Sequence, residues 1–387
     1  MSLTDLASRW LGGSVVAASD ESFGDKENLL SPDAPRFEPG RYGNRGEIVD
    51  GWETRRRRQA GNDWAIVRLG APGVITSVRV DTSFFTGNFP EQCVIEACGR
   101  EGYPGPAELD EPGWAEIVPR SPLLGDTLNT FAVADQRRFT HVRLSVFPDG
   151  GVARLRVLGR VVPDPRGLER LTIDLASQEH GGLVVSSSDD FYAAAQTLNR
   201  PDQARSMGEG WETRRRRDDG HDFVIFRLGL AGTVRQLVID TTHFRYNASA
   251  AVAVYGRDGG PWAPLLDRVR LQPDTRHVCA VHDERTVASV RLDAFPDGGL
   301  SRVRVIGSID PAARRRAGYR WFNSLPASQA LLCLANAGLP AETAATVAGQ
   351  RPLPPEWLAR PGELRPYLDV LARMLEGQSD RAWLTPG

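Results

Sequence analysis

The chain has 387 residues, of which 41% are hydrophobic and 25% are charged, so it is long enough for two or three domains and has neither a disordered nor a fibrous composition. Its formal net charge of −2 argues against a polyanion as the main partner. The first residues lack a basic segment followed by a long apolar run, and no stretch approaches the roughly 18 apolar residues of a membrane span. We therefore expect a cytoplasmic protein with no membrane partner.

A motif of eight residues, GWETRRRR, lies at Gly51–Arg58 among segments with a strand-like pattern. Val, Ile or Leu occupy alternate positions in AIVRLG, VITSVRVDT, CVIEAC, HVRLSVF and ARLRVLG. Clusters of Gly, Pro, Asp and Asn separate these segments. This pattern predicts the antiparallel strands of a β-sandwich and leaves no room for the helical crossovers of a parallel sheet.

The same eight residues recur at Gly210–Arg217, within a second copy of the whole pattern. Three blocks match in the same order, namely Gly12–Asp20 with Gly181–Asp189, Gly51–Gly70 with Gly210–Gly229, and Val142–Gly159 with Val290–Gly307. The middle block aligns without gaps and is identical at fourteen of twenty positions. The block spacing gives the first copy about ten extra residues in each of two surface loops. We expect an all-β fold of two tandem homologous jelly-roll-like antiparallel β-sandwich domains, at residues 1–165 and 166–312.

The end of the chain has a helical pattern instead. Leu331, Leu332 and Leu334 precede Gly338, and a second periodic apolar segment follows around Leu368–Leu375. This predicts a small α-helical extension at residues 313–387.

The arginine runs permit three interpretations. Basic clusters often bind nucleic acid, but no aromatic stacking platform accompanies these runs, and arginine is abundant throughout because Lys26 is the only lysine among 47 basic residues. We therefore expect no nucleic-acid partner. If the segment is extended, Glu53, Arg55 and Arg57 share one face, which favours a site for a compact anion. For any single arginine, a place on a solvated sheet surface explains the sequence equally well.

Two shorter motifs also recur. The segments DTSFFTGN at Asp81–Asn88 and DTTHFRYN at Asp240–Asn247 place a carboxylate, a hydroxyl and an amide around the end of a strand, where they could bind a ligand or cap a turn. The segment FPDGG at Phe147–Gly151 and Phe295–Gly299 has the chemistry of a hairpin turn.

Other catalytic motifs are absent from the sequence. No GxSxG, P-loop or GxGxxG lies in a strand-to-helix context. The six histidines form neither HxH nor HExxH, so no cofactor is evident and no metal ligand set can be read, although a divalent metal could polarise water.

The doubled GWETRRRR, with DTSFFTGN, DTTHF and FPDGG, resembles the allantoicase family, the allantoate amidinohydrolases of purine breakdown. The resemblance runs from about Gly12 to Gly307. It implies hydrolysis of allantoate to (S)-ureidoglycolate and urea by two jelly-roll repeats, in a homo-oligomer. The sequence departs from the family pattern at Phe84, where His is expected, and at Tyr246, where Gly is expected.

The chemistry of this reaction selects the candidate residues. A carboxylate substrate calls for a bidentate guanidinium, and cleavage of a carbon–nitrogen bond calls for a base on water and a proton for the departing urea. The catalytic candidates are Glu53, Glu212, Asp81, Asp240 and His243. The candidates for substrate binding are Trp52, Arg55, Arg57, Asn88, Trp211, Arg214, Arg216 and Asn247.

Two questions stay open from the sequence. Either or both repeats could be active, and the retained His243 favours the second. The alternative to an enzyme is a non-catalytic tandem β-sandwich that binds a small anion or a sugar.

Overall fold

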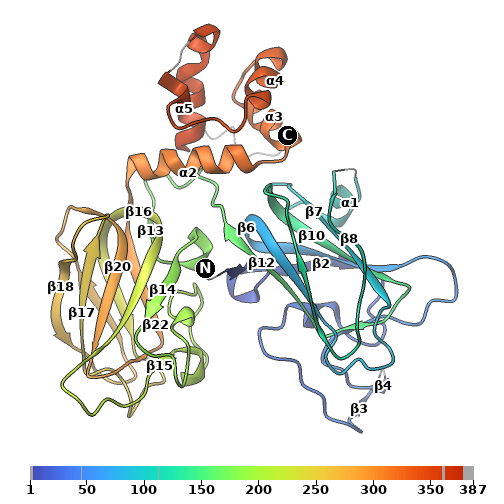
Figure 1. The fold of residues 1–387 in the computed structure, drawn as a ribbon, viewed down its shortest axis with the longest axis horizontal. Helices are drawn as coiled ribbons and strands as arrows, with labels where there is room; N and C mark the ends of the chain where they lie inside the picture. The colour runs from blue at the N-terminus through green and yellow to red at the C-terminus, as the bar shows by residue number, and fades with distance from the viewer. Residues whose placement is uncertain (1–2, 45, 112, 360–361, 378–387) are drawn as a thin grey trace. The chain divides into compact units, whose positions relative to one another are not determined.

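The computed structural model describes residues 3–44, 46–111, 113–359 and 362–377 (Figure 1). Contacts between residues divide the chain into two compact units. One unit is built on Leu3–Val162 and includes Phe322–Pro352; the other is built on Pro163–Trp321 and includes the described part of Leu353–Thr385. Each unit holds one copy of the sequence repeat.

The first repeat is an eight-stranded antiparallel sheet folded around one strand, β6. The strand order is β1-β12-β6-β10-β7-β8, and β2 and β9 also pair with β6. The strands of this sheet are β1 (Thr4–Asp5), β2 (Ser14–Ala18), β6 (Asp63–Asp81), β7 (Gln92–Cys98), β8 (Ala115–Pro122), β9 (Leu128–Ala132), β10 (Arg138–Phe147) and β12 (Arg154–Val161). The first half of β6 pairs with β2 and β10, and the second half pairs with β9 and β12, so β6 belongs to both layers of the sandwich.

The long strand corrects one expectation. The segments AIVRLG and VITSVRVDT form the single 19-residue strand β6 rather than two strands. The register with β10 shifts between Phe139 and His141, opposite the segment that contains Gly70 and Gly73. Added Cβ atoms at Gly70 and Gly73 would lie 2.4 Å and 2.2 Å from neighbouring backbone oxygens, so glycine permits the close crossing of the two layers.

The second repeat has the same topology. Its sheet order is β13-β22-β16-β20-β17-β18, and β14 and β19 also pair with β16. Its strands are β13 (Thr172–Asp174), β14 (Leu183–Ser187), β16 (Asp222–Asp240), β17 (Ala251–Arg257), β18 (Ala263–Arg270), β19 (Arg276–Ala280), β20 (Thr286–Phe295) and β22 (Arg302–Ile309). The all-β class and the tandem repeat are therefore confirmed.

Alternating apolar residues build each core. Ala65, Val67 and Leu69 point into the core of the first repeat, and Val224, Phe226 and Leu228 fill the same places in the second. The alternate side chains of these strand halves point to the other face of the sheet and include Arg68 and Arg227.

The FPDGG segment does not form the expected hairpin. It leads from β10 to β11 (Gly151–Val152), and β10 and β12 each pair with β6 instead of with each other. In the second repeat it leads from β20 to β21 (Gly299–Leu300). Because the strands before and after the turn lie in different layers, this turn joins the layers. The strand that follows the turn pairs with a strand of the GWETRRRR motif in each repeat: β11 pairs with β5 (Trp52–Glu53), and β21 pairs with β15 (Trp211–Glu212).

The two insertions of the first repeat form small elements of their own. The strands β3 (Tyr42–Gly43) and β4 (Gly46–Glu47) pair in one insertion, and the helix α1 (Pro106–Leu109) lies in the other. Short 3-10 helices complete both repeats: η1 (Arg9–Leu11), η2 (Lys26–Leu30), η3 (Gln178–His180), η4 (Ala195–Thr197) and η5 (Met207–Glu209).

The C-terminal segment is helical, as the sequence predicts. Its elements are α2 (Pro311–Ser324), α3 (Ala327–Asn336), α4 (Ala341–Gly349), η6 (Trp357–Ala359), η7 (Gly362–Tyr367) and α5 (Leu368–Glu376). By contacts, α3 and α4 belong to the unit of the first repeat, and α5 belongs to the unit of the second.

Candidate active site

The repeated motif begins with a buried tryptophan. Trp52 and Trp211 are 0% exposed, and each donates Nε1 to a backbone carbonyl, Asp20 O or Asp189 O, at 2.8 Å. Such a large buried ring fixes the position of the residue that follows it. The structure thus places both indoles in the cores, where they anchor β5 and β15.

A glutamate paired with an asparagine follows in each repeat. Asn88 Nδ2 donates to Glu53 Oε1 at 2.6 Å, and Asn247 Nδ2 donates to Glu212 Oε1 at 2.6 Å. Both glutamates are half-buried. Burial raises the pKa of Glu53, and the hydrogen bond from Asn88 offsets part of that rise. Among the residues that the structure describes, none donates to Oε2 of either glutamate, which leaves that oxygen as an acceptor for a ligand or a water.

The next arginine projects on the same side as the glutamate. Thr54 and Thr213 are buried, whereas Arg55 and Arg214 are exposed. The alternation expected for an extended segment therefore holds from the tryptophan to the first arginine. A carboxylate acceptor and a guanidinium donor lie two residues apart at each site.

The alternation stops after that arginine. Arg57 turns inward, and its Nη1 lies 2.7 Å from Oδ1 of Asp63, a residue that is 1% exposed. Its backbone N donates to Asp149 Oδ2 at 2.7 Å. Because β5 ends at Glu53, Arg57 does not share a face with Glu53 as the extended pattern predicted.

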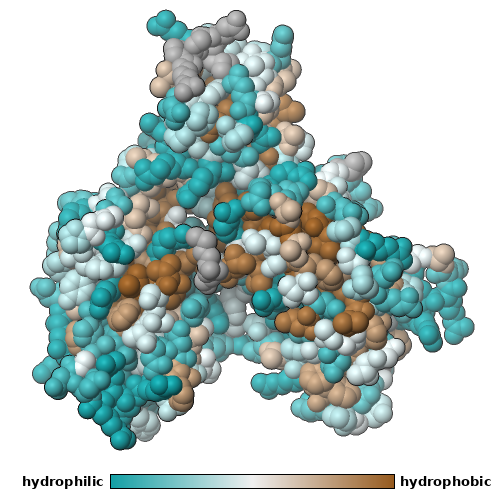
Figure 2. Space-filling view, in the orientation of Figure 1, coloured by the Kyte–Doolittle hydropathy of each residue, from teal (hydrophilic) through white to brown (hydrophobic). Residues whose placement is uncertain are grey.

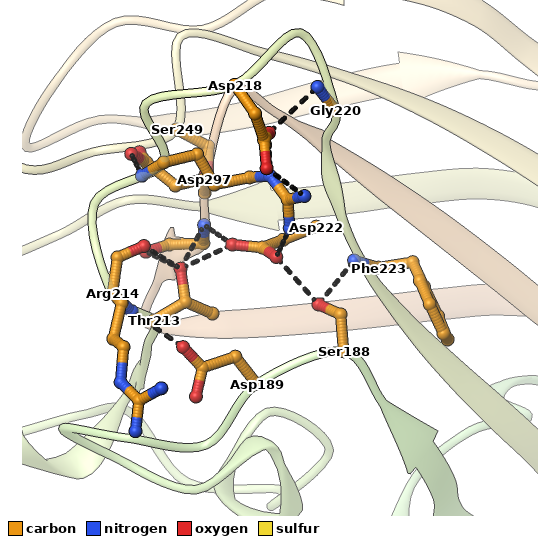
Figure 3. Close-up of polar contacts among 12 residues, drawn as sticks. Ser188, Asp189, Thr213, Arg214, Asp218, Gly220, Asp222, Phe223, Ser249 and Asp297 are labelled. Atoms are coloured by element: carbon orange, nitrogen blue, oxygen red, sulfur yellow. Dashed lines mark hydrogen bonds and ion pairs between the residues drawn. The ribbon is translucent and has the colours of Figure 1, made fainter.

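In the second repeat, the buried carboxylate of Asp222 binds side chains of the GWETRRRR segment (Figure 3). Asp222 Oδ1 accepts from Arg216 Nη1 at 3.0 Å and from Ser188 Oγ at 2.9 Å. Its Oδ2 accepts from Thr213 Oγ1 at 2.6 Å. Arg216 N also donates to Asp297 Oδ2 at 3.1 Å. These bonds fix the backbone on both sides of Arg214, so its position is set before a ligand binds.

The aspartates at the strand ends shape the following turns. Asp81 Oδ1 accepts from the N and Oγ of Ser83 at 2.9 Å and 2.6 Å. Asp240 Oδ1 accepts from the N and Oγ1 of Thr242 at 2.8 Å and 2.5 Å. Both therefore cap a turn, and each has a second carboxylate oxygen outside these bonds.

The residue three positions after each of these aspartates adopts a left-handed backbone in both repeats. Phe84 has φ 68° and His243 has φ 74°, although neither is glycine. Their backbone N atoms donate at 2.8 Å to Asp126 Oδ1 and Asp274 Oδ1, which stabilises this conformation. A strained backbone kept at the same place in two diverged copies points to a position that must project its side chain in a set direction.

The side chains at this position have different neighbours. Phe84 stacks on Phe37, with ring centroids 6.0 Å apart. His243 Nε2 lies 2.9 Å from the carbonyl oxygen of Ala204. The first repeat thus has an apolar ring contact where the second has an imidazole that hydrogen-bonds to a backbone carbonyl.

Sequence reasoning missed the aspartates that hold these segments. They are Asp20, Asp63 and Asp126 in the first repeat, and Asp189, Asp222 and Asp274 in the second. Asp20, Asp63 and their counterparts lie inside the aligned blocks, so comparing identical acids between the copies would have found them.

Two features are absent from the described residues. Residues 3–44, 46–111, 113–359 and 362–377 contain no group of three or more His, Cys, Asp or Glu side chains placed to hold a metal ion. No helix in the same part of the chain has the length and apolar character needed to cross a membrane.

The fold and the duplicated site define a class of protein, two homologous β-sandwiches that each present a glutamate–asparagine pair beside an arginine. The profile of the allantoicase repeat matches residues 4–162 and 173–310. The chain belongs to the allantoicase family.

Individual relatives agree with this assignment. The chain is 50% identical over 313 residues to a protein of Nocardia farcinica described as "Probable allantoicase", which covers 79% of this chain and 94% of the relative. It is 45% identical over 330 residues to a Streptomyces coelicolor protein with the same description, at 81% and 88% coverage. The crystal structure of allantoicase from Saccharomyces cerevisiae superposes with a TM-score of 0.69 and 35% identity, over 79% of this chain and 93% of that one.

Proposed function

We propose that this chain is a hydrolase that converts allantoate and water to (S)-ureidoglycolate and urea in purine degradation. The observation that carries the proposal is the glutamate–asparagine pair, with an arginine two residues further on, formed twice in a chain of the allantoicase family. The loop end of the second repeat, below β15, presents a mainly hydrophilic surface at the lower left of Figure 2, in keeping with a polar substrate.

The arginine and the glutamate bind opposite ends of the substrate. The guanidinium of Arg214 or Arg55 offers two parallel N–H donors to the substrate carboxylate. Oε2 of Glu212 or Glu53 accepts from a ureido N–H or from the attacking water. Asn247 and Asn88 orient the glutamates by holding Oε1 at 2.6 Å.

The reaction then replaces one bond by another. The water oxygen bonds to the central carbon of allantoate, the bond from that carbon to one ureido nitrogen breaks, and the departing nitrogen takes a proton to give urea. Glu212 accepts a proton from water. With Nε2 bound to Ala204 O, the other ring nitrogen of His243, Nδ1, is the one that can protonate the urea.

We assign turnover to the second repeat. The first repeat lacks a proton donor at the position of His243, because Phe84 stands there against Phe37. Four residues of the motif support the site without contacting the substrate: Arg57, Arg216, Trp52 and Trp211. The two arginines pair with Asp63 and Asp222, and the two indoles are 0% exposed. Asp81 and Asp240 shape the turns that carry Phe84 and His243.

We place this enzyme in the cytoplasm as a homo-oligomer. We also propose the domain division 1–165, 166–312 and 313–387, with the third part an α-helical extension.

The test is direct. Purified protein is incubated with allantoate, and urea and glyoxylate are measured colorimetrically over time. Release of stoichiometric urea is the expected result. Binding of allantoate without urea release would instead indicate a non-catalytic anion-binding module.

A further inference from the structure

A carboxylate holds the exposed arginine of the first repeat. Asp20 Oδ1 accepts from Arg55 N at 2.9 Å, and Asp20 Oδ2 lies 3.2 Å from Arg55 Nε. Ser22 joins the same cluster, since its N and Oγ donate to the two Asp20 oxygens at 3.0 Å and 2.9 Å. Burial alone would raise the pKa of Asp20, but these hydrogen bonds and the charge of Arg55 outweigh it and lower the pKa. Arg55 is thus partly neutralised before a ligand arrives.

Stacking replaces that ion pair in the second repeat. Asp189 still accepts from Arg214 N at 2.9 Å, but the guanidinium carbon lies 4.2 Å from the ring centroid of Phe191. Tyr192 meets Phe191 edge-on, with centroids 4.8 Å apart and ring planes at 82°. Within the described part of the chain, no carboxylate forms an ion pair with Arg214.

Ser22 and Phe191 occupy equivalent positions. Each lies two residues after the aspartate that accepts the arginine N–H. Each also lies two residues before the residue that bridges to the motif glutamate, Gly24 or Ala193. The molecule therefore contains a natural exchange of Ser for Phe beside the same arginine.

We propose that Phe191 is a positioning residue that makes the second repeat the tighter anion site, by holding the Arg214 guanidinium on its ring and away from Asp189. A guanidinium stacked on an aromatic face keeps its in-plane N–H donors for a carboxylate. In the first repeat, Asp20 competes with the substrate for those donors. The inference rests on the proposed function, which supplies the carboxylate ligand.

The test isolates the second site in the full chain. Glu53→Gln, Arg55→Ala is the background, because it removes the glutamate and the arginine of the first site. In this background, Phe191→Ser should raise the KM for allantoate and its calorimetric Kd about 10-fold, with kcat changed less than about 2-fold, because ground-state and transition-state binding weaken equally. Phe191→Tyr retains the ring and should keep both constants near those of the background. Phe191 is 54% exposed, so these variants should melt at the temperature of the background.

A second change separates positioning from general damage. Adding Asp189→Asn to Phe191→Ser keeps an acceptor for Arg214 N but removes the competing charge, and should recover most of the lost affinity. An unchanged KM and Kd in Phe191→Ser, a fall confined to kcat, or no recovery with Asp189→Asn would each overturn the inference. If the wild-type chain neither binds nor hydrolyses allantoate, the proposed function fails instead.

Discussion

The two repeats share their framework and differ at the rim of the site. The asparagine–glutamate bond is 2.6 Å and the tryptophan–carbonyl bond is 2.8 Å in both. The side chains near the motif glutamate and arginine differ, because Phe84 and Ser22 stand in the first repeat where His243 and Phe191 stand in the second. We expect the shared contacts to support the fold of both copies and the differing side chains to affect the activity of each copy.

The largest expected effect removes both motif glutamates. The double variant Glu53→Gln, Glu212→Gln keeps the size of each side chain and its bond to asparagine but removes the charge. We expect kcat for urea release to fall at least about 100-fold, on the scale of general acid–base groups. Steady-state assays with allantoate measure this. A normally folded double variant with wild-type turnover would remove both residues from the mechanism.

The next prediction compares the buried aspartates. Asp222→Ala removes the buried carboxylate that Arg216 and the Thr213 hydroxyl share, and should lower the free energy of unfolding by about 2–4 kcal/mol. Asp63→Ala should cost less, because Asp63 accepts no hydrogen bond from Thr54. Denaturant titration measures both. Asp218→Ala is the matched control, since its ion pair with Arg216 is exposed and should contribute little. Equal losses in all three variants would contradict the account.

Acid should destabilise the first repeat through a residue that the second lacks. His141 is 1% exposed, and burial, with the charges of Arg68 and Arg100, lowers its pKa to about 4. In the second repeat, Ser289 takes the place of His141. Ser289 pairs with Arg227 across the sheet as His141 pairs with Arg68 in the first repeat.

The sign of the pH effect follows from the lowered pKa. The unfolded chain protonates His141 near pH 6.5 and the folded chain only near pH 4, so the unfolded state binds more protons between these values. The contribution to stability is complete above pH 6.5 and is lost as the pH falls towards 4, up to about 3 kcal/mol. His141→Ser should flatten the stability profile of this unit between pH 7.5 and 4.5, measured by denaturant titration. An unaltered profile would exclude His141 as the source.

The smallest expected effect is the binding of nucleic acid to the arginine runs. Arg56, Arg58, Arg215 and Arg217 are exposed, but the chain carries a net charge of −2. We expect no sub-micromolar binding to random duplex DNA at about 150 mM salt. Fluorescence anisotropy tests this, and tight binding at that salt concentration would revive the nucleic-acid interpretation.

Part of this comparison could be predicted from sequence. Alternating apolar residues and three matched blocks were enough for two β-sandwiches, because burial on one face imposes the period of two. The hairpin predicted at FPDGG was wrong because local turn chemistry does not encode which layer the next strand joins. The split of β6 into two strands was wrong for a related reason, since Gly70 and Gly73 signal a break but here permit a crossing.

The sequence pattern did not predict where the arginine side chains of the motif point. Arg57 turns inward because Asp63 is buried behind it, and Arg214 stacks because Phe191 lies opposite. Asp63 recurs as Asp222, so the sequence marks the acid, but its burial behind Arg57 is a property of the fold. Phe191 has no aromatic counterpart in the first copy, where Ser22 stands, so the repeat pattern does not mark it.

The measurement that tests the central claim most directly compares the two single variants, Glu53→Gln and Glu212→Gln. Both are assayed for urea release from saturating allantoate, with folding checked by circular dichroism. If the second repeat carries turnover, Glu212→Gln loses at least about 100-fold in kcat and Glu53→Gln retains most of the wild-type rate. Two variants that each keep about half of the activity, or a loss confined to Glu53→Gln, would contradict the assignment.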